Sequence, residues 1–102
     1  MYNDREMIVS FGDKATEDVF QGRDTKAARR IGRLLWERVR LELDLLNASI
    51  TLEDLKVPPS NRLEKLRGDW AGYYSMRVND QYRLVFRFVG GNAVDVRCMD
   101  YH

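Results

Sequence analysis

The chain has 102 residues, which is enough for one hydrophobic core but too few for a cofactor domain plus a substrate domain. Its formal net charge of +1 gives no global signal for a polyanionic partner, and a composition of 44% hydrophobic and 32% charged residues is ordinary for a folded, soluble protein. We therefore predict a single domain over residues 1–102, in which residues 1–6 are an N-terminal extension.

Several classes of protein are excluded by what the sequence lacks. The single Cys98 rules out an internal disulfide, and no Cys and His spacing matches a metal site. The N-terminus does not read as a signal peptide, and no apolar stretch reaches the length of a membrane span. Paired carboxylates of the glycosidase type, a nucleophile elbow and a glycine-rich phosphate loop are also missing. We predict a cytoplasmic protein without a metal, cofactor or membrane association.

The N-terminal half combines short apolar runs with helix-capping residues. Residues 8–11 are β-branched and aromatic, which predicts a strand, and Gly12-Asp13 then predicts the N-cap of a short helix over residues 13–20. Asp24-Thr25 provides a second N-cap ahead of a helical pattern that reaches about Asn47. The sequence therefore predicts one strand followed by a short and a long helix.

The long helix is amphipathic, with one side predicted to face a core. Its apolar stripe comprises Ala28, Ile31, Leu35, Val39, Leu43 and Leu46, widened by Ala27, Leu34, Leu41 and Leu45. Its other side is expected to be solvated and carries Arg29, Arg30, Arg33, Glu37, Arg40 and Asp44. Trp36 lies near the polar side, where it fits either a partner interface or the periphery of the core.

After an irregular connector over residues 48–59, with a helical turn at residues 51–55, the hydrophobic period changes to two. Strands are predicted over residues 73–78, 82–88 and 94–101, joined by turns at Asn79-Asp80 and Gly90-Gly91. These strands predict an antiparallel meander with the helices on one face, which is an α+β fold.

Strict alternation along these strands decides which residues face the helices. The core-facing set is Tyr82, Leu84, Phe86, Phe88, Val94, Val96 and Cys98. The opposite, exposed face then carries Arg77, Arg83, Arg87, Arg97 and Tyr101. Such a face suits phosphate binding, but an open antiparallel sheet also needs a polar outer face, with Asp95 as an ion-pair partner. Alternation alone favours the second interpretation.

The chain ends in Asp100-Tyr101-His102, an acid, a phenol and the only histidine. RNA cleavage without metal needs one group to take the 2′-hydroxyl proton, one to protonate the leaving oxygen, and cations for the phosphorane charge. His102 suits proton transfer near neutral pH, whereas Arg67 and Arg83 can only bind and stabilise phosphate. Tyr101 could transfer a proton or stack on a base, and Asp100 either orients His102 or caps the strand end.

The second half of the chain resembles HigB-type toxins of the RelE/ParE superfamily. The resemblance rests on Asn61–Asp69 (NRLEKLRGD), Gly72–Phe86 (GYYSMRVNDQYRLVF), Asp95-Val96 and the Asp-Tyr-His end, in that order. It implies a RelE-like fold, with an N-terminal strand and two helices packed on one face of a mainly antiparallel sheet.

The resemblance also implies a function and a set of site residues. The function is that of a type II toxin, a ribosome-dependent mRNA endonuclease that cuts without metal or cofactor by 2′-hydroxyl attack. The implied partners are the ribosome, mRNA and a HigA-like helix-turn-helix antitoxin, with operator DNA contacted only through the antitoxin. The implied catalytic residues are Arg67, Arg83, Asp100, Tyr101 and His102. The implied RNA or ribosome contacts are Lys65, Arg77, Arg87 and Arg97.

One position departs from the family pattern. Where some members have a histidine three residues before the basic position, this chain has Glu64. Acid and base roles then fall to Tyr101 and His102, or Glu64 itself is the base. Two other functions stay open: a ParE-like toxin that binds DNA gyrase without nuclease activity, and a catalytically silent protein that only binds an antitoxin.

Overall fold

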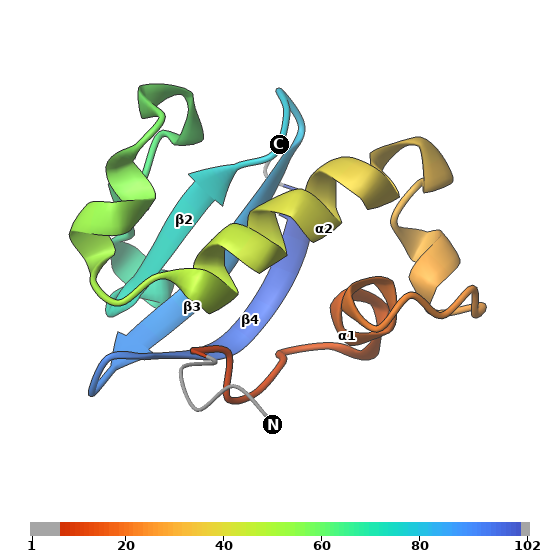
Figure 1. The fold of residues 1–102 in the computed structure, drawn as a ribbon, viewed down its shortest axis with the longest axis horizontal. Helices are drawn as coiled ribbons and strands as arrows, with labels where there is room; N and C mark the ends of the chain where they lie inside the picture. Colours follow the sequence, from red (N-terminus) through yellow and green to blue (C-terminus); the bar gives the residue numbers. More distant parts are fainter. Residues whose placement is uncertain (1–6, 101–102) are drawn as a thin grey trace.

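The computed structural model describes residues 7–100. Its elements, in chain order, are helix α1 (Lys14–Phe20), the 3₁₀ turn η1 (Ala28–Arg30), helix α2 (Arg33–Ala48), the 3₁₀ turns η2 (Leu52–Lys56) and η3 (Pro59–Asn61), strand β1 (Glu64–Lys65), the 3₁₀ turn η4 (Gly68–Trp70), and strands β2 (Tyr73–Arg77), β3 (Tyr82–Val89) and β4 (Asn92–Asp100). The strands form an antiparallel sheet in the order β1-β2-β3-β4, and both α-helices lie on one of its faces (Figure 1). The predicted α+β class is confirmed. No helix within residues 7–100 has the length and apolar character to cross a membrane.

The predicted first strand is an extended segment beside β4. Two isolated parallel bridges join Ile8 to Ala93 and Phe11 to Val96. The amide of Val9 donates to the carbonyl of Ala93 over 2.8 Å, and the amide of Val96 donates to Ser10 over 3.1 Å. These bonds attach the N-terminal segment to the outer edge of the sheet.

Helix α1 begins as predicted, with Asp13 as its N-cap. The Asp13 carboxylate accepts a hydrogen bond of 2.8 Å from the amide of Thr16. Farther along the helix, the carboxylate of Asp18 is fully buried and accepts hydrogen bonds from Lys14 Nζ (2.8 Å), Thr25 Oγ1 (2.6 Å) and Arg23 (3.3 Å). Asp18 thereby ties α1 to the segment that leads into η1.

We expect acid to weaken this anchor. The hydrogen bonds from Lys14 and Thr25 lower the pKa of Asp18 from an ordinary 3.8 to about 2. Because the pKa is lower in the folded state, ionised Asp18 stabilises the fold above about pH 4, and this contribution is lost as the pH falls through 2. Thermal unfolding should show Asp18→Asn well below wild type near pH 7 and the two curves converging near pH 2. A gap of constant size between them would contradict this account.

The predicted long helix is wrong at its start, because the chain forms η1, leaves helical geometry at Ile31 and Gly32, and begins α2 at Arg33. Trp36 Nε1 donates hydrogen bonds to the carbonyls of Ala28 (3.1 Å) and Ile31 (2.6 Å). In a continuous helix, backbone amides farther along the chain would donate to these carbonyls instead. Gly32 is also a poor helix former. Trp36 packs half-buried against the core, as the second of its two interpretations predicts.

The core side of α2 is narrower than predicted. Most of the predicted stripe is buried, and Val39, Leu43 and Leu46 are fully so. In contrast, Leu34 is 99% exposed and Leu41 is 60% exposed. Leu41 follows Val39 by two positions, which is about 200° around a helix, so it faces away from the sheet. Ala27 and Leu45, the other residues predicted to widen the stripe, are half-buried.

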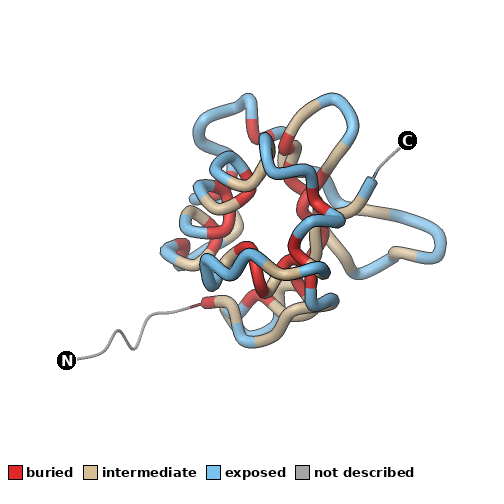
Figure 2. The backbone as a smooth tube through the Cα atoms, turned by 90° about the vertical axis from the view of Figure 1, so that its right-hand side faces the viewer, coloured by how far each residue is buried: buried red, intermediate tan, exposed pale blue. Residues whose placement is uncertain are grey.

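Both predicted hairpins are present, but the first turn spans residues 79–81 and not Asn79-Asp80 alone. Asn79 begins the β2–β3 turn, where its side-chain oxygen accepts hydrogen bonds from the amides of Gln81 (2.9 Å) and Tyr82 (2.7 Å). Gly90 and Gly91 connect β3 to β4 with φ values of +59° and +82°, which a two-residue hairpin turn of the mirror-image type requires. The core lies between the helices and the inner sheet face, where the buried positions gather in Figure 2.

A β-bulge in β4 changes the predicted alternation at one position. Asp95 has φ +57°, and the β3–β4 register shifts between Val85 and Arg87. Because the bulge adds one residue, Ala93 and Val96 are the buried ones, and Val94 pairs with Arg87 on the outer face. The prediction that Val94 faces the helix is therefore wrong.

Candidate functional site

The outer face of the sheet, opposite α2, carries the four arginines predicted to lie there. Strand pairing sets Glu64, Ser75, Val85 and Arg97 in one row across the sheet. The next row holds Arg77, Arg83 and Met99, and a third holds Tyr73, Arg87 and Val94. Arg83 belongs to one group of side chains and Arg87 and Arg97 to a second group around Trp70, while Arg77 is paired with Asp80 at the hairpin.

Arg83 is held more firmly than an exposed strand residue would be. Its Nε donates to Ser75 Oγ over 2.7 Å, and its Nη2 donates to the carbonyl of Arg62 over 2.6 Å. Arg62 has left-handed backbone geometry, with φ +49°, which aims that carbonyl at the guanidinium. The whole residue is only 7% exposed, so the prediction of an exposed Arg83 is wrong.

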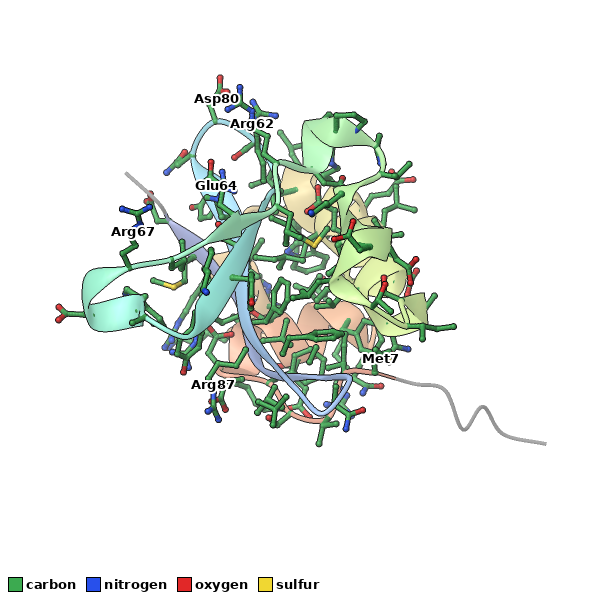
Figure 3. The ribbon with its side chains drawn as sticks, turned by 90° about the vertical axis from the view of Figure 1, so that its left-hand side faces the viewer. Met7, Arg62, Glu64, Arg67, Asp80 and Arg87 are labelled. Atoms are coloured by element: carbon green, nitrogen blue, oxygen red, sulfur yellow. The ribbon has the colours of Figure 1, made fainter. Side chains whose placement is uncertain are left out.

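Glu64 lies beside this arginine at the β1 edge, and Arg67 lies three residues farther along the same edge. Glu64 Oε1 is 3.6 Å from Arg83 Nη2, and the Glu64 side chain is 51% exposed. Arg67 follows β1 and is exposed, and its guanidinium has no ion pair within residues 7–100. Figure 3 shows Glu64 and Arg67 on the side of the sheet away from α2. We call Arg62, Glu64, Ser75 and Arg83, together with Arg67, the Arg83 site.

Other predicted site residues lie around or beyond this group. Lys65 pairs with Tyr74, which packs on the core side, so Lys65 points away from Glu64. Arg77 is ion-paired with Asp80 at the hairpin. Asp100 is exposed and accepts a hydrogen bond of 3.0 Å from Gln81 Nε2.

The end of β4 runs beside the Arg83 site. Met99 pairs with Arg83 and Asp100 with Tyr82, so the last described pair of the strand is one position beyond Arg83. Tyr101 and His102 lie outside the described residues.

The second group, which we call the Trp70 cluster, comprises Trp70, Tyr73, Arg87, Asp95 and Arg97. Trp70 and Tyr73 meet edge to face, with ring centroids 4.9 Å apart. The Arg97 guanidinium lies 5.5 Å from the Trp70 ring centre, and that of Arg87 lies 5.9 Å from Tyr73. Asp95 is 3.4 Å from both Arg87 Nη2 and the Tyr73 hydroxyl. Asp95 is therefore an ion-pair partner on this face, as the structural interpretation of the arginines predicts.

The two groups offer different chemistry. Arg83 presents a fixed, permanently charged guanidinium, and Arg67 adds a second cation, so the Arg83 site could stabilise charge developing on a phosphate. Glu64 is the carboxylate nearest to them among the pairs described. Burial, together with Asp13 and Glu42, raises the pKa of Cys98 to about 12, so this thiol is no nucleophile. Within residues 7–100, no three His, Cys, Asp or Glu side chains are grouped to hold a metal ion.

Three contributors were missed from the sequence. Ser75 is a small hydroxyl in an otherwise large-residue strand, and its position beside Arg83 after hairpin pairing was available as a signal. The carbonyl of Arg62 and the ring of Trp70 gave none, because their roles depend on a left-handed residue and on a loop that folds over the sheet.

Comparisons with known proteins identify the family. Residues 9–102 match the family described as RelE-like toxin of type II toxin-antitoxin system HigB. The chain is 38% identical over 89 residues to Toxin HigB-1 of Vibrio cholerae serotype O1, covering 87% of this chain and 92% of that protein. It is 39% identical over 41 residues to Endoribonuclease HigB of Proteus vulgaris, covering 40% of this chain and 45% of that protein.

Solved structures share the fold. The YoeB-YefM toxin-antitoxin heterotetramer from Staphylococcus aureus contains a chain that matches with a TM-score of 0.56 at 19% identity, covering 93% of this chain and 97% of that one. The YoeB/ParE toxin from Agrobacterium tumefaciens matches with a TM-score of 0.52 at 21% identity, covering 91% and 98%. The predicted RelE-like architecture is therefore confirmed. With the match over residues 9–102, the chain belongs to the HigB-like toxins, the RelE-like toxins of type II toxin-antitoxin systems.

Proposed function

We propose that this toxin is a ribosome-dependent endoribonuclease that cleaves mRNA without a metal, by attack of the 2′-hydroxyl on the adjacent phosphate. The observation that carries the proposal is the fixed guanidinium of Arg83, held by Ser75 and Arg62 beside the strand end that leads to Tyr101-His102. A donor that is oriented before the reaction stabilises transition-state charge without reorganisation.

In this mechanism the described residues bind and stabilise charge. Arg83 and Arg67 hold the scissile phosphate and stabilise the phosphorane oxygens, and neither transfers a proton. Proton transfer from the 2′-hydroxyl and to the leaving oxygen falls to Tyr101 and His102, with Glu64 as the alternative base. Asp100 and Arg77 flank the site, and the ribosome presents the mRNA.

The experiment that tests the function is 5′-end mapping of a reporter mRNA in a cell-free translation reaction containing the purified protein. A matched message that cannot be translated is the control. We expect cuts confined to translated codons. No cuts from demonstrably folded protein would overturn the proposal, and inhibition of DNA gyrase by the same sample would then favour the ParE-like alternative.

We also propose that an antitoxin docks on the outer side of α2. Leu34 and Leu41 are exposed, lie two helical turns apart, and are left uncovered by every element within residues 7–100. The surrounding segment, residues 23–40, contains seven Lys and Arg against two acids. Its chemistry fits an amphipathic antitoxin segment with apolar side chains flanked by acids. Two YoeB-YefM complexes among the structural neighbours support a protein partner of this class.

Negative charge at Leu34 and Leu41 is expected to weaken binding of the antitoxin without affecting the toxic activity. The double variant Leu34→Asp/Leu41→Asp should retain growth inhibition, because both residues lie on the face opposite the Arg83 site, but should weaken antitoxin binding by about 100-fold. Co-expression rescue and calorimetric titration with the purified antitoxin measure this. Charge-neutral Leu34→Gln/Leu41→Gln should have a smaller effect, and unchanged binding of the Asp variant would place the interface elsewhere.

A further inference from the structure

The need for glycine at position 12 comes from a neighbouring side chain and not from the backbone conformation of Gly12. Its φ lies outside the left-handed region that favours glycine. However, a Cβ placed on Gly12 would lie 2.3 Å from Arg97 Nε, 2.5 Å from Nη2 and 2.6 Å from Cζ. The absent side chain therefore leaves the space in which the Arg97 guanidinium lies.

The opposite neighbour of this guanidinium is an indole ring. Arg97 lies 5.5 Å from the centre of Trp70, and its Nε is buried and has no hydrogen-bond partner among the described residues. The buried Nε shows that the inner edge of this guanidinium is packed against the protein. Packing between Gly12 and Trp70 is what holds Arg97 in position.

Trp70 belongs to the same short turn as Arg67. It is the last residue of η4, and its amide donates to the carbonyl of Arg67 over 3.2 Å. Trp70 lies in the turn between β1 and β2 and Arg97 lies on β4, so their side chains meet over the outer face of the sheet between these strands. Val85 lies between them on this outer face and is fully buried. Trp70 therefore ties the loop that carries Arg67 to the far strand of the sheet.

We propose that Gly12, Arg97 and Trp70 form a clamp that holds the turn carrying Arg67 against the outer face of the sheet. All three are positioning residues, and Arg97 acts through its contact with Trp70. The catalytic consequence, though not the clamp itself, rests on the proposed nuclease function.

Limited trypsinolysis tests the clamp without any activity assay, because trypsin cuts after Arg67. We expect Gly12→Ala and Trp70→Ala to accelerate release of the fragment ending at Arg67 by at least about 10-fold, measured by mass spectrometry at a temperature where all variants are folded. Gly32→Ala is the matched control, since a Cβ there meets nothing within 4 Å and its φ is −52°. Equal rates for Gly12→Ala and Gly32→Ala would overturn the clamp.

Cleavage kinetics test what the clamp does for the reaction. Trp70→Ala should lower single-turnover cleavage of ribosome-bound mRNA by about 10-fold to 100-fold, and Trp70→Phe should restore most of it. In an Arg67→Ala background, Trp70→Ala should cost nothing further, because its effect passes through Arg67. Losses that multiply would overturn the positioning role. If wild type cuts no RNA, the nuclease proposal fails, and the trypsin result still decides the clamp.

Discussion

Replacing Arg83 by lysine is expected to lower mRNA cleavage by about 100-fold or more, although the charge of the side chain is unchanged. The guanidinium of Arg83 donates from Nε to Ser75 and from Nη2 to Arg62, in a planar arrangement that a single ammonium cannot reproduce. A lysine would keep the charge but lose the orientation that directs it at the phosphate. Single-turnover cleavage on programmed ribosomes measures the loss.

The control for this experiment follows from the sheet register. Arg77 pairs directly with Arg83 on the same face, but it makes its ion pair with Asp80 at the hairpin. Arg77→Lys should therefore keep cleavage within about 3-fold of wild type, since charge is retained and no buried partner is lost. If Arg83→Lys were as active as Arg77→Lys, the fixed guanidinium would not be the catalytic feature.

Arg83→Ala tests the catalytic role less cleanly than Arg83→Lys does. Because Arg83 is buried, its removal would also lower the stability of the fold. Removing the guanidinium would leave Ser75 Oγ and the Arg62 carbonyl without their donor, at a cost of about 1–3 kcal/mol each if no water replaces it. Alternation along β3 predicts the face of Arg83 correctly but not its burial. Burial arises from residues that pack around it from β1 and β2, which a strand pattern does not include.

The parts of the fold that the sequence predicts are those with local causes. Asp13 caps α1, Asn79 and Gly90-Gly91 form hairpins, and period-two alternation defines β2 and β3. The break before α2 and the bulge at Asp95 were missed, because each depends on distant contacts. The break before α2 depends on the Trp36 indole, which donates hydrogen bonds to two backbone carbonyls. The bulge depends on the N-terminal segment, where Ser10 Oγ accepts a hydrogen bond from the Asp95 amide.

The same division applies to the candidate site. The outer-face placement of Arg87 and Arg97 follows from alternation, but their engagement with Tyr73 and Trp70 does not. From the sequence, Gly12 is predicted only to separate the first strand from the helix cap at Asp13. Its contact with Arg97 joins positions 85 residues apart, which the pairing of the N-terminal segment with β4 brings together.

Deleting Tyr101 and His102 is expected to reduce cleavage by about 100-fold to 10,000-fold, the range that positioned general acid–base groups supply. Strand β4 is described to Asp100, one pairing position beyond Arg83, so the deletion leaves every described ladder hydrogen bond in place. The melting temperature should stay near that of wild type. Cleavage that survives the deletion would exclude both residues as proton carriers.

Glu64→Gln separates the two remaining assignments of the base. Glu64 lies 3.6 Å from Arg83 Nη2, where its carboxylate can orient that guanidinium. We therefore expect Glu64→Gln to lose less than about 10-fold and to keep the wild-type dependence of rate on pH. His102→Gln should remove the inflection near neutral pH that an imidazole imposes. If Glu64→Gln instead removes that inflection, Glu64 is the base and His102 donates the proton to the leaving oxygen.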